Sequence, residues 1–300
     1  MREVLRSAVN TWDCDHMGHL NVRHYLRHSK HGLNVLLLQL GLPPETCKER
    51  GLVVRARDQH LRFRQELRPG TSFTVQAGIV ANEPSLIAYE EMRTLQGEVS
   101  ATIVSELALF ESRTGSEAAW PEALLEAARQ ERCAVPPYAA VRSVTETPTR
   151  KRIRHDQALK MGLMPGFLGA VTVSDCDASG LMHEAGCMAL IADGISHTFR
   201  ALYGLVERPP GIGGAALEYR FVFHSWPQLD QLVEVRSGVS SLGSKTIQLT
   251  HHLFELASGA CFATAQAVIA WFDLDARKTV ALPDDLRALV ADKLIEGLSL

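Results

Sequence analysis

The sequence predicts an α+β protein in which one domain occurs twice in tandem, and three observations support this. The motif DCDHMG at residues 13–18 recurs as DCDASG at residues 175–180, at an offset of 162 residues. Each motif is followed by one long apolar-rich segment and then by four segments of extended character. The same offset relates Gly97 to Gly259 and Phe110 to Phe272, so the correspondence reaches the far end of each copy.

In the first copy, we expect an opening strand at residues 4–12 and a helix at residues 21–40. Gly41 ends this helix, because a left-handed C-terminal cap needs no Cβ. A short helix is expected at residues 117–130, since Trp120-Pro121 suits a helix start. Between these helices, four strands are expected at residues 52–65, 71–80, 87–94 and 98–111.

The second copy has the same order. Alternation of Leu217, Tyr219 and Phe221 with polar residues predicts a strand with one face in the core. A helix is expected at residues 184–203, a terminal helix at 284–296, and strands at 167–174, 216–224, 232–239, 246–256 and 260–273. These elements give domains at residues 1–131 and 166–275, a linker at 132–165 and a C-terminal helical tail at 276–300. Its prolines and charges predict that the linker is a solvent-exposed strap.

Composition excludes several classes of protein. With 46% hydrophobic and 22% charged residues the chain is globular, and a net charge of -3 offers no field to hold nucleic acid or an anionic membrane. No leader-like segment or membrane-length apolar run occurs, so we expect a cytoplasmic protein. The six cysteines form no C-x-x-C pair, which argues against a zinc knuckle or a redox pair.

One strand, one long helix and four strands, in that order, resemble the hot-dog fold. The pattern D-x-D-x-x-G-H-L-N-x-x-x-Y at residues 13–25 is similar to the motif that opens the central helix of hot-dog thioesterases of the 4-hydroxybenzoyl-CoA type. The segments at residues 41–44 and 49–53 are similar to the part after that helix. The resemblance implies, in each copy, a long central helix wrapped by a five-stranded antiparallel sheet. Hot-dog domains work as pairs, so it also implies that the two copies pack as a pseudo-dimer.

The same resemblance implies an acyl-CoA thioesterase, which hydrolyses an acyl thioester to a free acid and a thiol. The functional aspartate of the family corresponds to Asp15 and, in the second copy, to Asp177. His19 matches a position that is catalytic in related acyl-carrier-protein thioesterases, although Met17 replaces their intervening asparagine. Asn21 completes the candidate catalytic set.

The second copy departs further from the pattern. Leu181 stands where His19 would be, His183 where Asn21 would be, and Cys187 where the motif tyrosine would be. Glu184 also adds a second negative charge, which is expected to raise the pKa of the more buried acid. We therefore expect the first copy to hold the competent site, or the more active one.

The chemistry of the motif suits thioester hydrolysis without a metal or an added cofactor, coenzyme A being part of the substrate. A carboxylate before a helix start can act at the carbonyl carbon, while free N–H groups of the first turn stabilise the oxygen. Gly18 and Gly180 allow close approach of a ligand, and His183 is a further candidate for substrate binding. The alternative is that these aspartates only cap helices.

Two basic segments are candidates for contacts with the phosphates of coenzyme A. One is the linker run at residues 150–154, and the other is a strip of arginines on the second strand of the first copy: Arg55, Arg57, Arg62 and Arg64. The alternative is that both sets are solvated charges that prevent strand pairing.

Other interpretations stay open at this point. His24, His28 and His31 lie at helical spacing, but without a third-ligand pattern they indicate a solvated helix face rather than zinc. Asp193 in the second helix is expected to be paired. A hot-dog hydratase or dehydratase and a non-catalytic acyl-thioester-binding protein are the alternative functions. The expected partner is a small acyl thioester on coenzyme A or, less favoured, on an acyl carrier protein. A homo-oligomer of the double unit is a further alternative.

Overall fold

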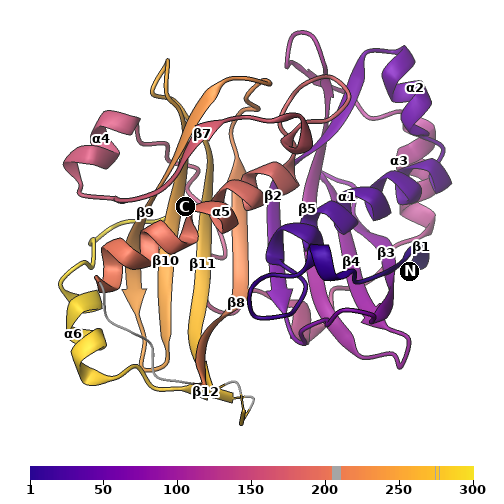
Figure 1. Cartoon of the computed structure of the whole chain (residues 1–300). Helices are drawn as coiled ribbons and strands as arrows, with labels where there is room; N and C mark the ends of the chain where they lie inside the picture. The colour runs from indigo at the N-terminus through magenta and orange to yellow at the C-terminus, as the bar shows by residue number, and fades with distance from the viewer. Residues whose placement is uncertain (205–210, 274, 277) are drawn as a thin grey trace. The chain divides into compact units, whose positions relative to one another are not determined.

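The computed structural model describes residues 1–204, 211–273, 275–276 and 278–300 (Figure 1). The chain divides into two compact units. Unit 1 comprises residues 1–140 and 183–188, and unit 2 comprises residues 141–182 and 189–300. Unit 1 thus contains the first copy of the repeat together with the first turn of the second copy's long helix.

Unit 1 consists of a five-stranded antiparallel sheet and a long helix. The strands are β1 (Arg2–Ala8), β2 (Leu52–Phe63), β3 (Ser72–Ala81), β4 (Leu86–Thr94) and β5 (Val99–Glu111). They pair in the order β1-β3-β4-β5-β2. Helix α1 (Val22–Gln39) contacts β1 and β3, and Figure 1 shows it crossing one face of this sheet.

Helix α1 forms where apolar side chains recur at helical spacing. Leu26, Leu33 and Leu37 are all buried. The Asn21 side chain caps the start of the helix by accepting the N–H of Arg23 at 3.1 Å. After the C-terminal residue, Gly41 adopts a φ of 90°. Removing one such leucine side chain, as in Leu33→Ala, costs about 2–5 kcal/mol of stability.

Unit 2 has the same architecture. Its strands are β7 (Met164–Ala170), β8 (Ile212–Phe223), β9 (Leu232–Leu242), β10 (Thr246–Glu255) and β11 (Cys261–Asp273). They pair antiparallel in the order β8-β11-β10-β9-β7. Helix α5 (Glu184–Tyr203) contributes its residues from 189 onward. Gly194 lies so close to the backbone of Gly166 and Phe167 that a Cβ there would collide with it, which fixes α5 against β7.

The predicted order of one strand, a long helix and four strands is confirmed in both copies. Both opening strands end sooner than predicted, because 3-10 turns follow at Thr11–Asp13 and Val173–Asp175. The short helix predicted from residue 117 is α3 (Glu122–Gln130), which begins after Pro121. The terminal helix is α6 (Asp284–Ala291).

Among the described residues, five short elements have no counterpart in the sequence prediction. They are α2 (Pro44–Glu49), β6 (Glu117–Ala118), a 3-10 turn at Pro137–Ala139, α4 (His155–Lys160) and β12 (Lys278–Val280). Strand β6 pairs with β5 and β12 pairs with β11, so each forms by extending an existing sheet. Segments this short carry no measurable periodicity, and their structure depends on tertiary contacts.

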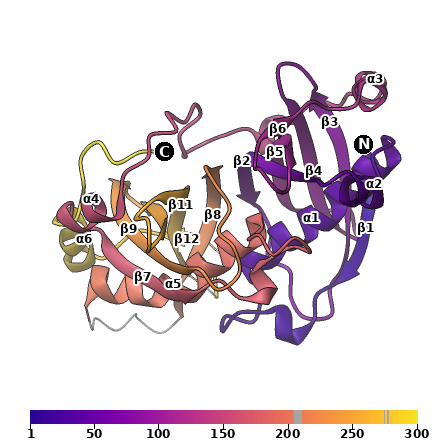
Figure 2. The ribbon, with the colours of Figure 1, turned by 90° about the horizontal axis from the view of Figure 1, so that it is seen from above.

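Most residues of the linker are exposed, as predicted, but a few of its apolar side chains are buried. Ala139, Ala158 and Leu163 in the linker are each at most 2% exposed. Ala158 and Leu163 pack in one cluster with Phe254 of β10 and Cys261 of β11. The apolar residues between the linker's charges therefore cover part of the unit 2 sheet. In Figure 2, α4 and α6 both lie beside β9, and α6 contacts that strand.

Candidate active site

The turn that precedes α1 is a closed loop held by its own backbone. The N–H of Asp15 donates to the carbonyl of His19 at 2.9 Å, and the N–H of Gly18 donates to the carbonyl of Asp15 at 3.0 Å. Gly18 has a φ of 79°, a conformation that favours glycine, and no heavy atom lies within 4 Å of the position of a Cβ there. The loop therefore holds Asp15 in place and leaves open space beside Gly18.

The carboxylate of Asp15 has two different partners. Its Oδ1 accepts the N–H of Met17 at 2.9 Å, and its Oδ2 lies 3.3 Å from Nδ1 of His19. Burial by itself would raise the pKa of Asp15, but the hydrogen bond and charge of His19 and the nearby N–H groups outweigh this and lower it. Asp15 is therefore ionised at neutral pH.

A second carboxylate reaches the same histidine. Oε1 of Glu66, in the loop after β2, lies 3.4 Å from Nε2 of His19. The side chains of Asp15, His19 and Glu66 are 25%, 17% and 24% exposed, so a substrate can reach them. Sequence reasoning missed Glu66, because this contact joins segments more than forty residues apart. The only local signal is its place before Leu67, whose carbonyl accepts the N–H of Leu20 at 2.8 Å.

Other residues of the motif support this turn. Asp13 is buried and accepts hydrogen bonds from Asn10 and Arg27, each at 3.3 Å. Tyr25 is buried, which raises its pKa to about 12, and the charges of Glu66 and Asp15 raise it further. Asn21 uses its side-chain oxygen for the helix cap, so its geometry is that of a structural residue.

The equivalent turn of the second copy lacks the histidine and the second carboxylate. Oδ1 of Asp177 accepts the N–H of Ser179 at 2.8 Å, and Gly180 has a φ of 76°. The N–H of Met182 donates to the carbonyl of Pro227 at 2.8 Å, as that of Leu20 does to Leu67. The residue before Pro227 is Trp226, which therefore occupies the position of Glu66. Thus Leu181 and Trp226, two apolar residues, replace His19 and Glu66.

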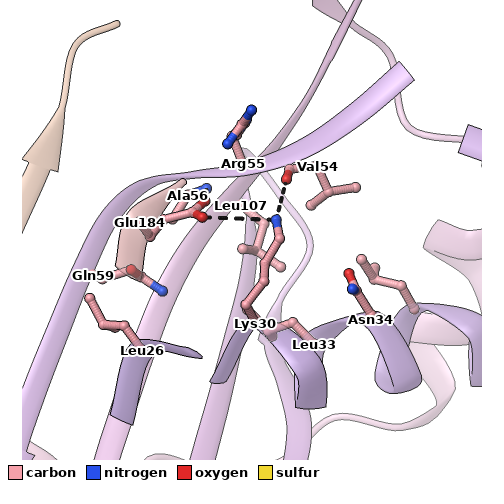
Figure 3. Close-up of a pocket in the computed structure, with 11 residues that line it drawn as sticks. Leu26, Lys30, Leu33, Asn34, Val54, Arg55, Ala56, Gln59, Leu107 and Glu184 are labelled. Atoms are coloured by element: carbon pink, nitrogen blue, oxygen red, sulfur yellow. Dashed lines mark hydrogen bonds and ion pairs between the residues drawn. The ribbon is translucent and has the colours of Figure 1, made fainter. Parts of the chain in front are cut away.

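A buried ionic cluster lies elsewhere in unit 1 (Figure 3). Oε1 of Glu184 accepts the N–H of Ala56 at 2.8 Å, and its Oε2 is 3.9 Å from Nζ of Lys30. Lys30 also donates to the carbonyl of Val54 at 2.7 Å, while the neighbouring Arg55 is fully buried. The cavity beside these groups has a volume of about 10 Å³, enough for one water molecule.

The cluster corrects one expectation. The pKa of Glu184 is not raised: burial acts to raise it, but the charges of Lys30 and Arg55 outweigh this and lower it. The neighbouring His183 is partly exposed, its Nδ1 accepts the N–H of Gly186 at 2.9 Å, and burial lowers its pKa. The sequence singled out Glu184 and Arg55 separately but gave no sign that they meet, and it missed Lys30.

The four arginines predicted to form one strip on β2 differ in exposure: Arg55 is buried, Arg57 and Arg62 are partly exposed, and Arg64 is exposed just after the strand. Arg57 forms an ion pair with Glu117. Arg62 donates to the carbonyl of Ala140 at 3.1 Å, and the guanidinium of Arg64 lies 5.0 Å from the ring centre of Tyr138. Arg62 and Arg64 thus hold the start of the linker.

The other candidate groups are placed as follows. His28 is buried with its ring against Phe73 at 4.9 Å, so the expectation of a solvated histidine face is wrong for this residue. Asp193 is exposed. Within the described ranges, no group of three or more His, Cys, Asp or Glu side chains is arranged to hold a metal ion. No helix among the described residues is both long and apolar enough to cross a membrane.

The two copies of one helix-and-sheet domain, each opened by the same turn, define a tandem hot-dog protein. Three solved structures share this fold. The first is a candidate oleoyl thioesterase from Lactobacillus plantarum, with a TM-score of 0.65 and 14% sequence identity, covering 89% of this chain and 94% of that chain. The second is an acyl-ACP thioesterase from Bacteroides thetaiotaomicron, with a TM-score of 0.63 and 11% identity, covering 88% of this chain and 96% of that chain. The third is the 12:0-ACP thioesterase from Umbellularia californica, with a TM-score of 0.66 and 12% identity, covering 89% of this chain and 93% of that chain. At these identities the similarity shows the fold.

The sequence itself identifies the family. It matches the thioesterase-like superfamily over residues 9–128 and again over residues 171–290. The chain belongs to this superfamily and is by class a thioester hydrolase. A comparison with curated proteins gave no significant match.

Proposed function

We propose that the chain hydrolyses acyl-CoA thioesters to a free acid and coenzyme A at the turn before α1. Membership of the thioesterase-like superfamily supports the reaction class. The observation that carries the assignment to this turn is the chain of contacts from Asp15 through His19 to Glu66. An ionised carboxylate that is partly buried and held by a histidine is a group suited to acid–base chemistry.

In the proposed reaction Asp15 acts as the general base. It takes a proton from a water molecule, whose oxygen forms a bond to the thioester carbonyl carbon. The bond from this carbon to sulfur then breaks, and Asp15 gives the proton to the leaving sulfur, while His19 stays between the two carboxylates and holds Asp15 in place. Glu66 is a positioning residue that orients the imidazole. The positive end of the α1 dipole favours the negative charge that develops on the carbonyl oxygen.

The substrate-binding part of the proposal is narrower than the sequence prediction. Gly18 stays in it, because the space beside it is open. Arg62, Arg64 and His183 are left out, because each already contacts protein groups that it would have to release. Asp177 is proposed to be a structural residue that closes its own turn. The reaction as proposed uses no cofactor apart from the coenzyme A of the substrate.

The test is thiol release from acyl-CoAs of graded chain length, followed with a thiol reagent, and from the same acyl groups on an acyl carrier protein. Faster release from the coenzyme A esters supports the proposal, while faster release from the carrier protein would overturn the choice of thiol carrier. Conversion of an enoyl-CoA without thiol release would show a hydratase. Binding without any conversion would show a non-catalytic protein.

A further inference from the structure

Unit 2 contains a cavity of about 430 Å³ that is lined by the linker, by β10 and by residues near position 298. Lys151, Arg152 and Lys160 give it a basic lining, while Met161 and Leu298 supply apolar surface. Nζ of Lys160 lies 3.5 Å from Oδ2 of Asp156, which partly neutralises its charge. The volume falls within the range of sites for small molecules and is much larger than a single water molecule requires.

His252 of β10 lines this cavity and is 1% exposed. No described residue lies within hydrogen-bonding distance of either of its ring nitrogens. Burial, together with the charge of His224, lowers the pKa of His252 to about 4, so the ring is neutral at neutral pH. A neutral imidazole has one N–H donor, and a buried donor without an acceptor costs about 1–3 kcal/mol.

In the first copy, the side chain at the position equivalent to His252 has hydrogen-bond partners within the protein. His252 pairs with Thr264 in the register of β10 and β11, as Glu91 pairs with Thr102 in β4 and β5, and these threonines are related by the repeat. The carboxylate of Glu91 accepts hydrogen bonds from the hydroxyls of Tyr89 and Tyr138 and from Arg93. Among the described residues of the second copy, His252 has no such partners, and it lines the cavity instead.

We propose that this cavity is a binding site for a small organic phosphate. The phosphate would lie between Lys151 and Arg152 and accept the N–H of His252, and the organic part would pack against Met161 and Leu298. A dianion matches a site with several cations and a neutral donor better than a single carboxylate does. Orthophosphate alone would leave most of the cavity empty. This inference does not depend on the proposed thioesterase activity.

The charges around His252 agree with an anion as the ligand. His224, which directly follows β8, lowers the pKa of His252, and Arg152 and Arg150 of the linker lower the pKa of His224 in turn. Arg236 of β9 pairs with His252 of β10 in the sheet register. The guanidinium of Arg236 lies 2.8 Å from Oε1 of Glu234, which neutralises its charge. The excess charge near the cavity is therefore positive.

The test uses the full chain with its histidines labelled with ¹⁵N, titrated with inorganic phosphate as the probe. We expect saturable binding that raises the pKa of His252 by at least one unit. The double substitution Lys151→Gln with Arg152→Gln should weaken binding about tenfold or more. Lys293→Gln, which removes a charge from the same unit outside the cavity lining, should leave binding unchanged. No saturable binding, an unmoved His252 pKa or full binding by the double variant would overturn the proposal.

The source of the phosphate is distinguished with further probes. Tighter binding of 4′-phosphopantetheine than of glycerol 3-phosphate points to the arm of a thiol carrier, and the reverse order points to a free phosphate ester. Equal binding of succinate would overturn the choice of phosphate. His252→Phe fills a similar space without a donor and should weaken phosphate binding. Its melting temperature shows whether the loss comes from the ligand contact or from unfolding.

Discussion

Replacing Asp15 with asparagine removes the charge from the proposed active site and leaves the turn nearly intact. The Asn side-chain oxygen can still accept the N–H of Met17, which Oδ1 now accepts at 2.9 Å. What is lost is the ionic contact with His19 at 3.3 Å. A contact of this kind near the surface contributes about 0.2–1 kcal/mol. The melting temperature should therefore fall by no more than about 4 °C.

The effect of Asp15→Asn on catalysis should be far larger. Loss of a general base lowers kcat/KM by about 10²- to 10⁴-fold, equivalent to about 2.7–5.4 kcal/mol of transition-state stabilisation. Steady-state thiol release and thermal unfolding, measured on one preparation, compare the two effects, with Asp177→Asn as the matched control. Less than a threefold loss of kcat/KM in Asp15→Asn, or an activity loss that only tracks unfolding, would refute the catalytic role and favour helix capping.

Three further predictions follow from the same geometry. Glu66→Gln should lower kcat about 10- to 100-fold and alter its pH profile while leaving KM nearly unchanged, as expected for a residue that orients another group. An unaltered pH profile of kcat would mean that Glu66 is only structural. Glu184→Gln leaves Lys30 and Arg55 without their carboxylate and should lower the free energy of unfolding, measured in urea, by about 3–5 kcal/mol. Adding Lys30→Met to this variant should restore part of the loss. A loss below about 1 kcal/mol would contradict the buried ion pair. Because the pKa of Asp15 is lowered, its carboxylate is ionised above pH 3.8, the usual pKa, and activity should be lost only as the pH falls through the lowered pKa. A fall of kcat/KM on the acid side near pH 6 that Asp15→Asn abolishes would contradict this assignment.

The parts of the fold that the sequence predicted are those that depend on local patterns. The repeat at an offset of 162 residues and the helical spacing of apolar residues before Gly41 and Gly204 predicted two equivalent domains. The packing of the two copies as a pseudo-dimer stays a prediction. His28 shows a limit of pattern reading: a helix wrapped by a sheet is covered on more than one side, so a polar row can be buried against Phe73.

Only the part of the candidate site that lies within one turn could be predicted from the sequence. Asp15 and His19 belong to one turn and are close in sequence, so the motif shows both. Glu66 reaches His19 from the loop after β2, and Glu184 reaches Lys30 from a segment more than 150 residues away. Contacts of this kind have no local signal. In the second copy, Leu181 stands in place of the histidine, and Trp226 stands in place of the carboxylate that contacts this histidine in the first copy.

The most direct test of an active site at Asp15 is single-turnover thiol release from an acyl-CoA by the wild-type chain, Asp15→Asn and Asp177→Asn. In the first copy Asp15 contacts His19, which also contacts Glu66, whereas in the second copy Asp177 accepts hydrogen bonds from Ser179 of its own turn. We expect Asp15→Asn to abolish the product amplitude and Asp177→Asn to keep it. Equal losses would mean two working sites, and a loss confined to Asp177→Asn would place the active site in the second copy and contradict the assignment to Asp15.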